Sequence, residues 1–161
     1  MKMKLAVVVM TFFVLFAGDA CAQSASSPAG QAIRPVMTKM LAAANALDTD
    51  AFMAPMLRSP SLVFAINGEV IQGWNALHAQ QLKWWSKGKH ATKFTYAQNG
   101  APGFLALGSS VEIVTWPLVS HWTSPGGKAG SSNFVVTYIW QRLPQGWRIV
   151  YGHESWKKLP G

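Results

Sequence analysis

Among the residues that could do chemistry, His153 near the end of the chain is the best candidate for a proton-transferring group. If residues 143–146 form a tight turn, Arg142 pairs with Trp147 in a hairpin, and this register places Val136 opposite His153. An imidazole on an apolar face can donate or accept a proton near neutral pH. We therefore predict a catalytic role for His153; the alternative is a structural histidine, hydrogen-bonded within the strand. A slip of one residue in the turn would exchange the two faces of one strand.

Aromatic side chains gather on the same predicted face of the hairpin. The register sets Trp140 opposite Ile149 and Tyr138 opposite Tyr151, and all eight tryptophans of the chain lie within residues 74–156. Such a lining favours an apolar or ring-bearing ligand, although aromatic residues also fill ordinary cores. The predicted ligand-binding residues are His78, Trp85, Trp116, Tyr138, Trp140 and Tyr151.

Metal and cofactor chemistry is not expected. The four histidines, at positions 78, 90, 121 and 153, are scattered and show no His-x-x-x-His spacing or pairing with cysteine. A metal site needs three or four ligands that converge. We therefore predict neither a metal nor another cofactor.

Residues 1–22 have the three parts of a cleavable secretory signal peptide. Two lysines precede an apolar stretch at residues 5–17, and Ala20-Cys21-Ala22 supplies the small-x-small pattern before Gln23. An apolar stretch of 13 residues is short against the roughly 20 that a spanning helix needs, which disfavours a membrane anchor. We predict a protein exported to the periplasm or secreted, with no transmembrane segment in the mature chain.

The only cysteine, Cys21, is expected to leave with this signal peptide. The mature chain then has no thiol, which excludes a disulfide, a cysteine nucleophile and a thiolate metal site. Lipid attachment at Cys21 is the alternative, but Gly18 stands where such a signal needs a large aliphatic residue. Stability must then come from the burial of apolar side chains.

Without Lys2, Lys4 and Asp19, the balance is 12 basic against 5 acidic residues. This charge could attract acidic lipids, polysaccharide or nucleic acid, but it serves solubility equally well. No basic-aromatic motif of a nucleic-acid-binding protein accompanies it, so no nucleic-acid partner is expected. The length is enough for a single domain, predicted over residues 31–158 after a flexible lead-in at residues 23–30.

The first part of this domain is predicted to be helical. Apolar residues recur at three- and four-residue steps over residues 33–47, and Asp48 can cap a short second helix that ends before Pro55. The pair Asn67-Gly68 between apolar runs predicts a hairpin, because both residues accept a positive φ. After Gly73, residues 74–85 have the spacing of an amphipathic helix.

The second half of the domain is predicted to be a run of strands. Residues alternate in polarity over 93–98, 104–107, 111–116, 119–123, 134–142 and 147–155. Residues 126–132 are interpreted as a mobile hairpin loop. Helices followed by sequential strands predict an α+β fold in which a curved antiparallel sheet wraps around the N-terminal helices.

The C-terminal hairpin also resembles a known family. Phe134 to Arg142 and the ending Gly-Trp-Arg-Ile-Val-Tyr-Gly-His-Glu-Ser, which closes at Ser155, resemble the SnoaL-like branch of the nuclear-transport-factor-2-like superfamily. The order of the upstream elements is similar as well, so the likeness covers residues 31–156. It implies a cone-shaped fold, usually a homodimer, around a small-molecule cavity. The acids of its ketosteroid-isomerase-like members have no match, since Glu112 and Glu154 are the only acidic residues in the strand-rich half.

The function that this resemblance implies is the binding of a small hydrophobic or aromatic molecule in the cavity of an exported protein. Isomerase or dehydratase activity is compatible with it, but a shared fold does not choose a reaction, so whether the protein is an enzyme stays open. The alternative is a non-catalytic dimeric binding or assembly module of the cell envelope. That alternative predicts a filled cone and a broad apolar face on the outside of the sheet.

Overall fold

The structure is a computed structural model that describes residues 27–86 and 91–157. The expected signal peptide lies outside the described residues. The described chain forms three helices and seven strands: α1 (Pro28–Ala46), α2 (Thr49–Met53), β1 (Val63–Ile66), β2 (Glu69–Gln72), α3 (Trp74–Trp84), β3 (Lys93–Gln98), β4 (Gly103–Ala106), β5 (Val111–Thr123), β6 (Ala129–Leu143) and β7 (Gly146–Trp156).

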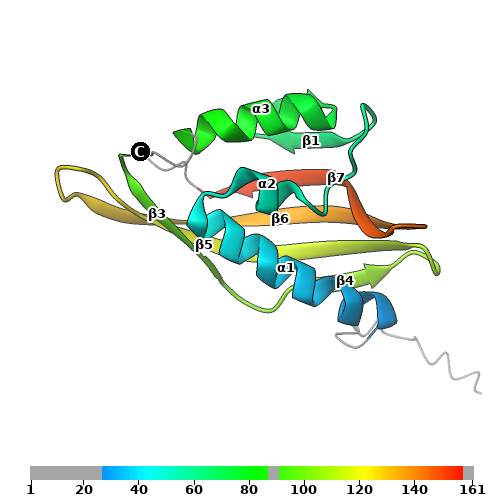
Figure 1. Ribbon diagram of the computed structural model, residues 1–161. Helices are drawn as coiled ribbons and strands as arrows, with labels where there is room; N and C mark the ends of the chain where they lie inside the picture. Colours follow the sequence, from blue (N-terminus) through cyan, green and yellow to red (C-terminus); the bar gives the residue numbers. More distant parts are fainter. Residues whose placement is uncertain (1–26, 87–90, 158–161) are drawn as a thin grey trace, which may run out of the picture.

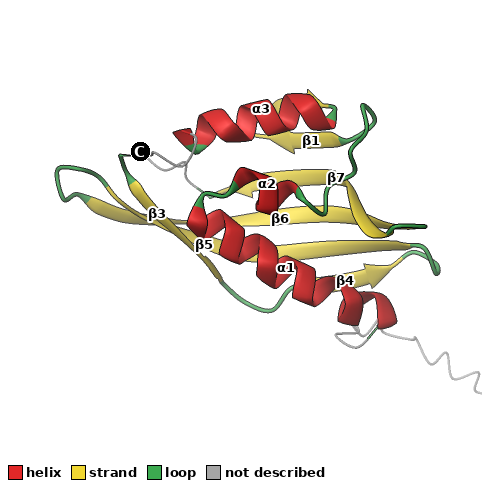
Figure 2. Cartoon of the chain, viewed as in Figure 1, coloured by secondary structure: helices red, strands yellow, loops and turns green. Residues whose placement is uncertain are grey.

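The seven strands form one sheet with the order β2-β1-β7-β6-β5-β3, and β4 pairs with β5 beside this path. All pairs are antiparallel except β1 with β7, which are parallel. The three helices lie on the same side of the sheet (Figures 1 and 2). The predicted α+β cone of a single domain is confirmed.

Helix α1 begins at Pro28, so the end of the expected flexible lead-in is helical. The Ser27 side chain accepts a hydrogen bond of 2.9 Å from the Gly30 backbone N–H, and proline suits the first helical position because it needs no N–H partner. The side of α1 that faces the sheet buries Ile33 and Met40 in the core. The core therefore lies between the helices and the concave face of the sheet.

The hairpin between β1 and β2 has the turn expected from its sequence. Asn67 and Gly68 both have positive φ, at 52° and 82°. Two successive residues in this region match the twist of the flanking strands. This turn fixes the pairing of Ile66 with Glu69, and β2 lies at the edge of the sheet.

Strand β5 is continuous, whereas two separate strands were expected on either side of Pro117. The proline is tolerated because it falls between the part of β5 that pairs with β4, which ends at Thr115, and the part that pairs with β3, which starts at Leu118. Strand β6 likewise begins at Ala129, so most of the predicted loop at residues 126–132 belongs to the sheet.

The closing hairpin departs from the predicted register after its first residues. Arg142 pairs with Trp147 and Trp140 with Ile149, as expected, but a β-bulge follows, and Ile139 pairs with Tyr151. The extra residue, Val150, has no partner of its own. Tyr138 therefore lies opposite Gly152, and Val136 opposite Glu154, so the predicted pairs Tyr138–Tyr151 and Val136–His153 are wrong.

Candidate functional site

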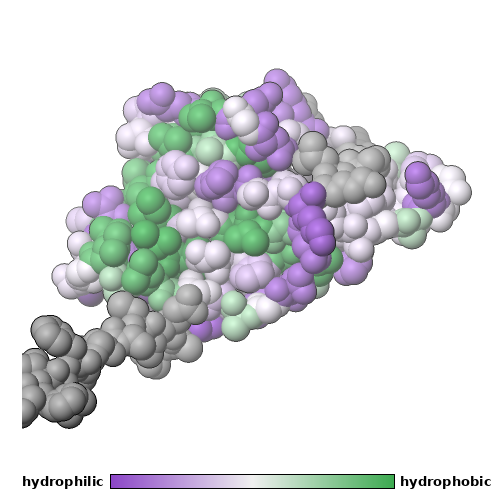
Figure 3. Space-filling view, turned by 180° about the vertical axis from the view of Figure 1, so that it is seen from behind, coloured by the Kyte–Doolittle hydropathy of each residue, from purple (hydrophilic) through white to green (hydrophobic). Residues whose placement is uncertain are grey.

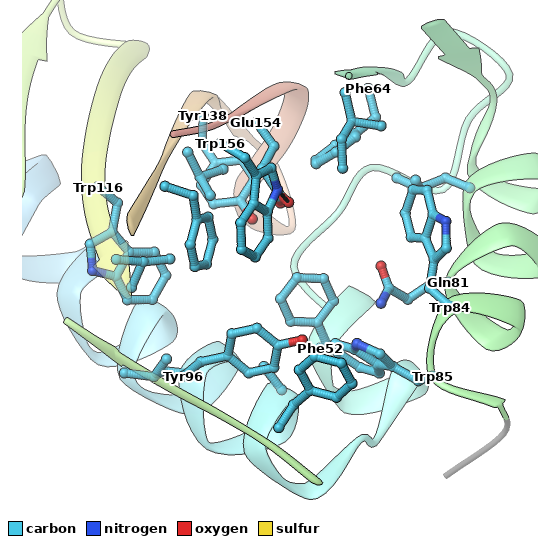
Figure 4. A pocket seen from close by; sticks show the side chains of 18 of the residues that line it. Phe52, Phe64, Gln81, Trp84, Trp85, Tyr96, Trp116, Tyr138, Glu154 and Trp156 are labelled. Atoms are coloured by element: carbon cyan, nitrogen blue, oxygen red, sulfur yellow. Dashed lines mark hydrogen bonds between the residues drawn. The ribbon is translucent and has the colours of Figure 1, made fainter. Parts of the chain in front are cut away.

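A cavity of about 280 Å³ lies between the helices and the concave face of the sheet (Figure 4). Its walls come from the end of α1, from α2 and the segment after it, from α3 with the residue that follows, and from strands β1, β3, β5, β6 and β7. Most of the lining is apolar and aromatic. The few polar side chains among these walls therefore decide what the cavity can do.

Among the described residues that line the cavity, Glu154 is the only acidic one. The bulge at Val150 turns it to the concave face, opposite Val136. Burial raises the pKa of the Glu154 carboxyl to about 7, and a hydrogen bond from Trp156 counteracts part of that rise. A pKa near neutral pH suits a group that acts as an acid or a base in proton transfer.

Trp156 holds this carboxyl in place. Its Nε1–H donates a hydrogen bond of 2.5 Å to Glu154 Oε1. The indole ring in turn stacks on Phe134, with ring centroids 4.1 Å apart and planes 10° from parallel. Because a stacked ring has little freedom to turn, Trp156 orients the carboxyl toward the cavity seen in Figure 4.

Two tyrosines supply further polar groups to the wall. Asn45 near the end of α1 forms two hydrogen bonds with the backbone of Tyr96 in β3. Its Nδ2 donates to the Tyr96 carbonyl at 2.9 Å, and its Oδ1 accepts from the Tyr96 N–H at 2.7 Å. Burial raises the pKa of Tyr96 to about 12, helped by the negative charge of Glu154 and opposed by a hydrogen bond with Trp85. Burial, with the same charge, raises the pKa of Tyr138 further. Both hydroxyls stay protonated at neutral pH and can donate hydrogen bonds.

Helix α3 forms the remaining wall. Gln81 points from it into the cavity beside Trp84 and Trp85 (Figure 4), and the Trp85 ring meets Phe52 edge to face, with centroids 5.1 Å apart. No lysine, arginine or histidine lines the cavity in the described part of the chain. The described residues of the lining therefore supply no positive charge that would bind an anionic ligand.

Three of the predicted ligand-binding residues, Trp85, Trp116 and Tyr138, line the cavity. Trp140 does not; it is completely buried in the core below. Tyr151 lies on the outer face of the sheet, half-buried, and His153 is exposed there. The structure thus does not bring the predicted catalytic His153 into the cavity, because the bulge reverses the two faces of β7 beyond Val150.

His78, the sixth predicted ligand-binding residue, is also outside the cavity lining. Its Nε2 lies 2.7 Å from Asp50 Oδ1, and its ring stacks on Trp74 with centroids 4.7 Å apart. The guanidinium of Arg58 lies over the Trp74 ring, 4.4 Å from its centroid. His78 therefore ties α3 to α2 and positions a wall of the cavity.

Sequence reasoning missed Glu154, Trp156, Tyr96 and Gln81, which supply much of the polar part of the site. One signal for the bulge was present: Gly152 interrupts an otherwise regular strand pattern, and a glycine there often marks a bulge or a close approach. A Cβ at Gly152 would lie 2.5 Å from the Phe64 ring. Gly152 therefore lies on the inner face of the sheet, whereas Tyr151 and His153 on either side of it lie on the outer face.

The described residues offer neither a metal site nor a membrane-spanning helix. No group of three or more histidine, cysteine, aspartate or glutamate residues could hold a metal ion there. None of the three described helices is long and apolar enough to cross a membrane.

A curved sheet closed by helices around an apolar cavity is the cone of the nuclear-transport-factor-2-like class of proteins. Within that class, the chain belongs to the SnoaL-like domain family, which matches residues 33–157. No curated protein matches the chain significantly.

Solved structures agree on the fold. A nuclear transport factor 2-like superfamily protein from Salmonella enterica has 20% identity and a TM-score of 0.67, with 81% of this chain and 92% of that one covered. A ketosteroid isomerase-like protein from Erwinia carotovora has 14% identity and a TM-score of 0.63, with 80% and 96% covered. A putative calcium/calmodulin-dependent protein kinase II association domain from Xanthomonas campestris has 14% identity and a TM-score of 0.63, with 82% and 89% covered.

Proposed function

We propose that this protein is an exported homodimer that binds a small hydrophobic or aromatic molecule in its cavity and transfers a proton to or from it through Glu154. The observation that carries the proposal is the Glu154 carboxyl group, whose pKa burial raises to about 7, in a cavity with mostly apolar and aromatic walls. Strongly shifted acids in apolar cavities are typical of sites that carry out acid-base chemistry. Isomerisation and dehydration are the reaction types that such a group serves.

Each reaction gives Glu154 a definite task. In an isomerisation its carboxylate takes a proton from a carbon next to a carbonyl group and returns it to another carbon. In a dehydration the carboxylate takes a proton from the carbon next to a carbonyl group and, once protonated, gives it to the hydroxyl group on the neighbouring carbon, which leaves as water while the double bond forms. Tyr96 and Tyr138 donate hydrogen bonds to an oxygen on which negative charge develops, and in an apolar cavity such bonds are strong.

The second candidate is a non-catalytic dimeric binding or assembly module of the cell envelope. It is favoured by the structural likeness to a protein whose name describes it as an association domain, and by apolar side chains on the outer face of the sheet, among them Val135. An unfilled cavity of about 280 Å³ counts against a vestigial pocket. We therefore prefer the cavity-based function.

The proposal is tested on native protein from its export compartment. We expect a mature chain that starts at Gln23 and carries an uncharged aromatic or alicyclic molecule identified by mass spectrometry. The substitution Glu154→Gln keeps the size of the side chain but removes its proton chemistry. It should abolish turnover of that molecule, or weaken its binding about tenfold if the protein only binds it.

The matched control is His153→Gln, which changes the exposed neighbour on the outer face. It should leave both binding and turnover unchanged. Protein that carries no ligand, or that binds it equally well with Glu154→Gln, would contradict the proposal, provided that the variant has the thermal stability of the native chain.

A further inference from the structure

We infer that Gln81 determines which ligands this cavity accepts, by binding a second polar group on a ligand whose first polar group meets Glu154. The inference rests on the proposed function and makes its ligand more specific. The two side chains come from different walls, Gln81 from α3 and Glu154 from β7 (Figure 4). A ligand that satisfies both must therefore carry two separated polar groups.

Gln81 is a polar interruption in an apolar stripe of α3. Leu77 and Trp85 lie four residues before and after it, and their side chains are 2% and 7% exposed. Gln81 itself is 8% exposed, so its amide is almost removed from bulk water. An aliphatic residue of similar size would fit this stripe better if the position served only to pack α3 against the sheet.

No hydrogen bond of the Gln81 amide is found in the described part of the chain, and its atoms are not among the fully enclosed polar atoms without a partner, so the amide is open to the cavity that Gln81 lines. The contrast with Asn45 is direct, since both ends of that amide bond to the backbone of Tyr96. Because Gln81 lines the cavity, a molecule inside the cavity can reach its amide. The arrangement leaves one donor group and one acceptor group for the ligand.

The chemistry of the walls limits the ligand further. The described residues of the lining include no basic side chain, and Glu154 is charged in part near pH 7, so these walls disfavour a carboxylate or phosphate ligand. Hydroxyl and carbonyl groups suit an amide and a carboxyl group equally well. A volume of about 280 Å³ is just under the range of roughly 300–1,000 Å³ typical of drug-sized ligands, so one or two fused rings fit.

The test compares naphthol with a set of dihydroxynaphthalenes that differ in the position of the second hydroxyl group. Dissociation constants are measured by isothermal titration calorimetry for the native chain, for Gln81→Leu, and for Gln80→Leu as the matched control, because Gln80 precedes it on α3 outside the cavity lining. We expect the native chain to bind at least one diol about tenfold more tightly than naphthol.

Gln81→Leu should remove this preference and bind naphthol at least as tightly as the native chain does, whereas Gln80→Leu should keep the preference. The inference about Gln81 would be wrong if the native chain bound naphthol and every diol with equal affinity, or if the preference survived Gln81→Leu. Neither result would contradict the proposed function. If neither naphthol nor any diol binds the native chain, the inference and the proposed function both fail. Thermal melting of each variant shows that the comparison is made on folded protein.

Discussion

Two carboxyl groups in this protein have raised pKa values through burial, but they differ in their surroundings. Glu154 faces the cavity and is held by Trp156. Glu112 is 1% exposed, and neither of its oxygens has a hydrogen-bond partner in the described chain. Its cross-strand neighbour, Trp140, has an unpaired Nε1 as well. A carboxyl group in this situation is best accommodated in its uncharged form.

These two groups predict that the protein is most stable in mildly acidic solution. A raised pKa means that the folded chain binds the proton more tightly than the unfolded chain, so stability is greatest below pH 4.5 for these groups and is lost as the pH rises through the folded pKa. For Glu154, with a pKa of about 7 instead of 4.5, the loss is at most about 3 kcal/mol.

Urea denaturation between pH 5 and pH 8 measures this loss. Glu154→Gln and Glu112→Gln should each make the free energy of unfolding fall less as the pH rises, because the variants have no proton to lose at that position. A free energy of unfolding that is constant over this range in the native chain would rule out the raised pKa values.

At the scale of elements, one extra residue in β7 creates the site. The bulge at Val150 brings Gly152, Glu154 and Trp156 to the concave face. Gly152 then lies under two rings: a Cβ there would be 2.5 Å from Phe64 Cδ2 and 3.2 Å from Tyr138 Cε1. The lack of a side chain at this position lets the rings of β1 and β6 meet across β7.

Gly152→Ala is therefore expected to lower the free energy of unfolding by about 1–3 kcal/mol, because the added methyl group must displace the Phe64 and Tyr138 rings from their places over Gly152. The matched control is Gly126→Ala, in the turn between β5 and β6, where nothing lies within 4 Å of the added Cβ. Chemical denaturation of both variants measures the difference. Equal stability of the two would mean that Phe64 moves aside without cost.

At the scale of the whole molecule, the sheet has a second face that the helices do not cover. Figure 3 shows this face, where apolar residues are mixed with polar ones. Val135 on β6 is 37% exposed there, and Ile113 and Ile139, which pair with each other on the same face, are half-buried. A face of mixed polarity can form a subunit interface, because such interfaces are about as apolar as the rest of a protein surface.

We predict that the proposed homodimer forms through this face. Val135→Asp places a charge in the contact and should yield a monomer in sedimentation equilibrium, with an unchanged circular dichroism spectrum. Val70→Asp is the matched control, because Val70 is 69% exposed on the edge strand β2 and should not affect assembly. A native chain that sediments as a monomer, or a Val135→Asp variant that remains dimeric, would contradict this interface.

The sequence by itself determined the order and type of nearly every element of the fold. The spacing of apolar residues in α1 and α3, the turn at Asn67-Gly68 and the alternation along the strands are local signals, and local signals fix local structure. They also placed Trp85, Trp116 and Tyr138 in elements that enclose a cavity.

Only the tertiary structure decided which acid-base group the cavity contains. Because side chains alternate with a period of two, the single extra residue at Val150 exchanges the inner and outer faces of the strand beyond it. His153 moves to the surface and Glu154 moves inward. That choice depends on how Phe64, Tyr138 and Gly152 fit together across three strands, which no short stretch of the sequence contains.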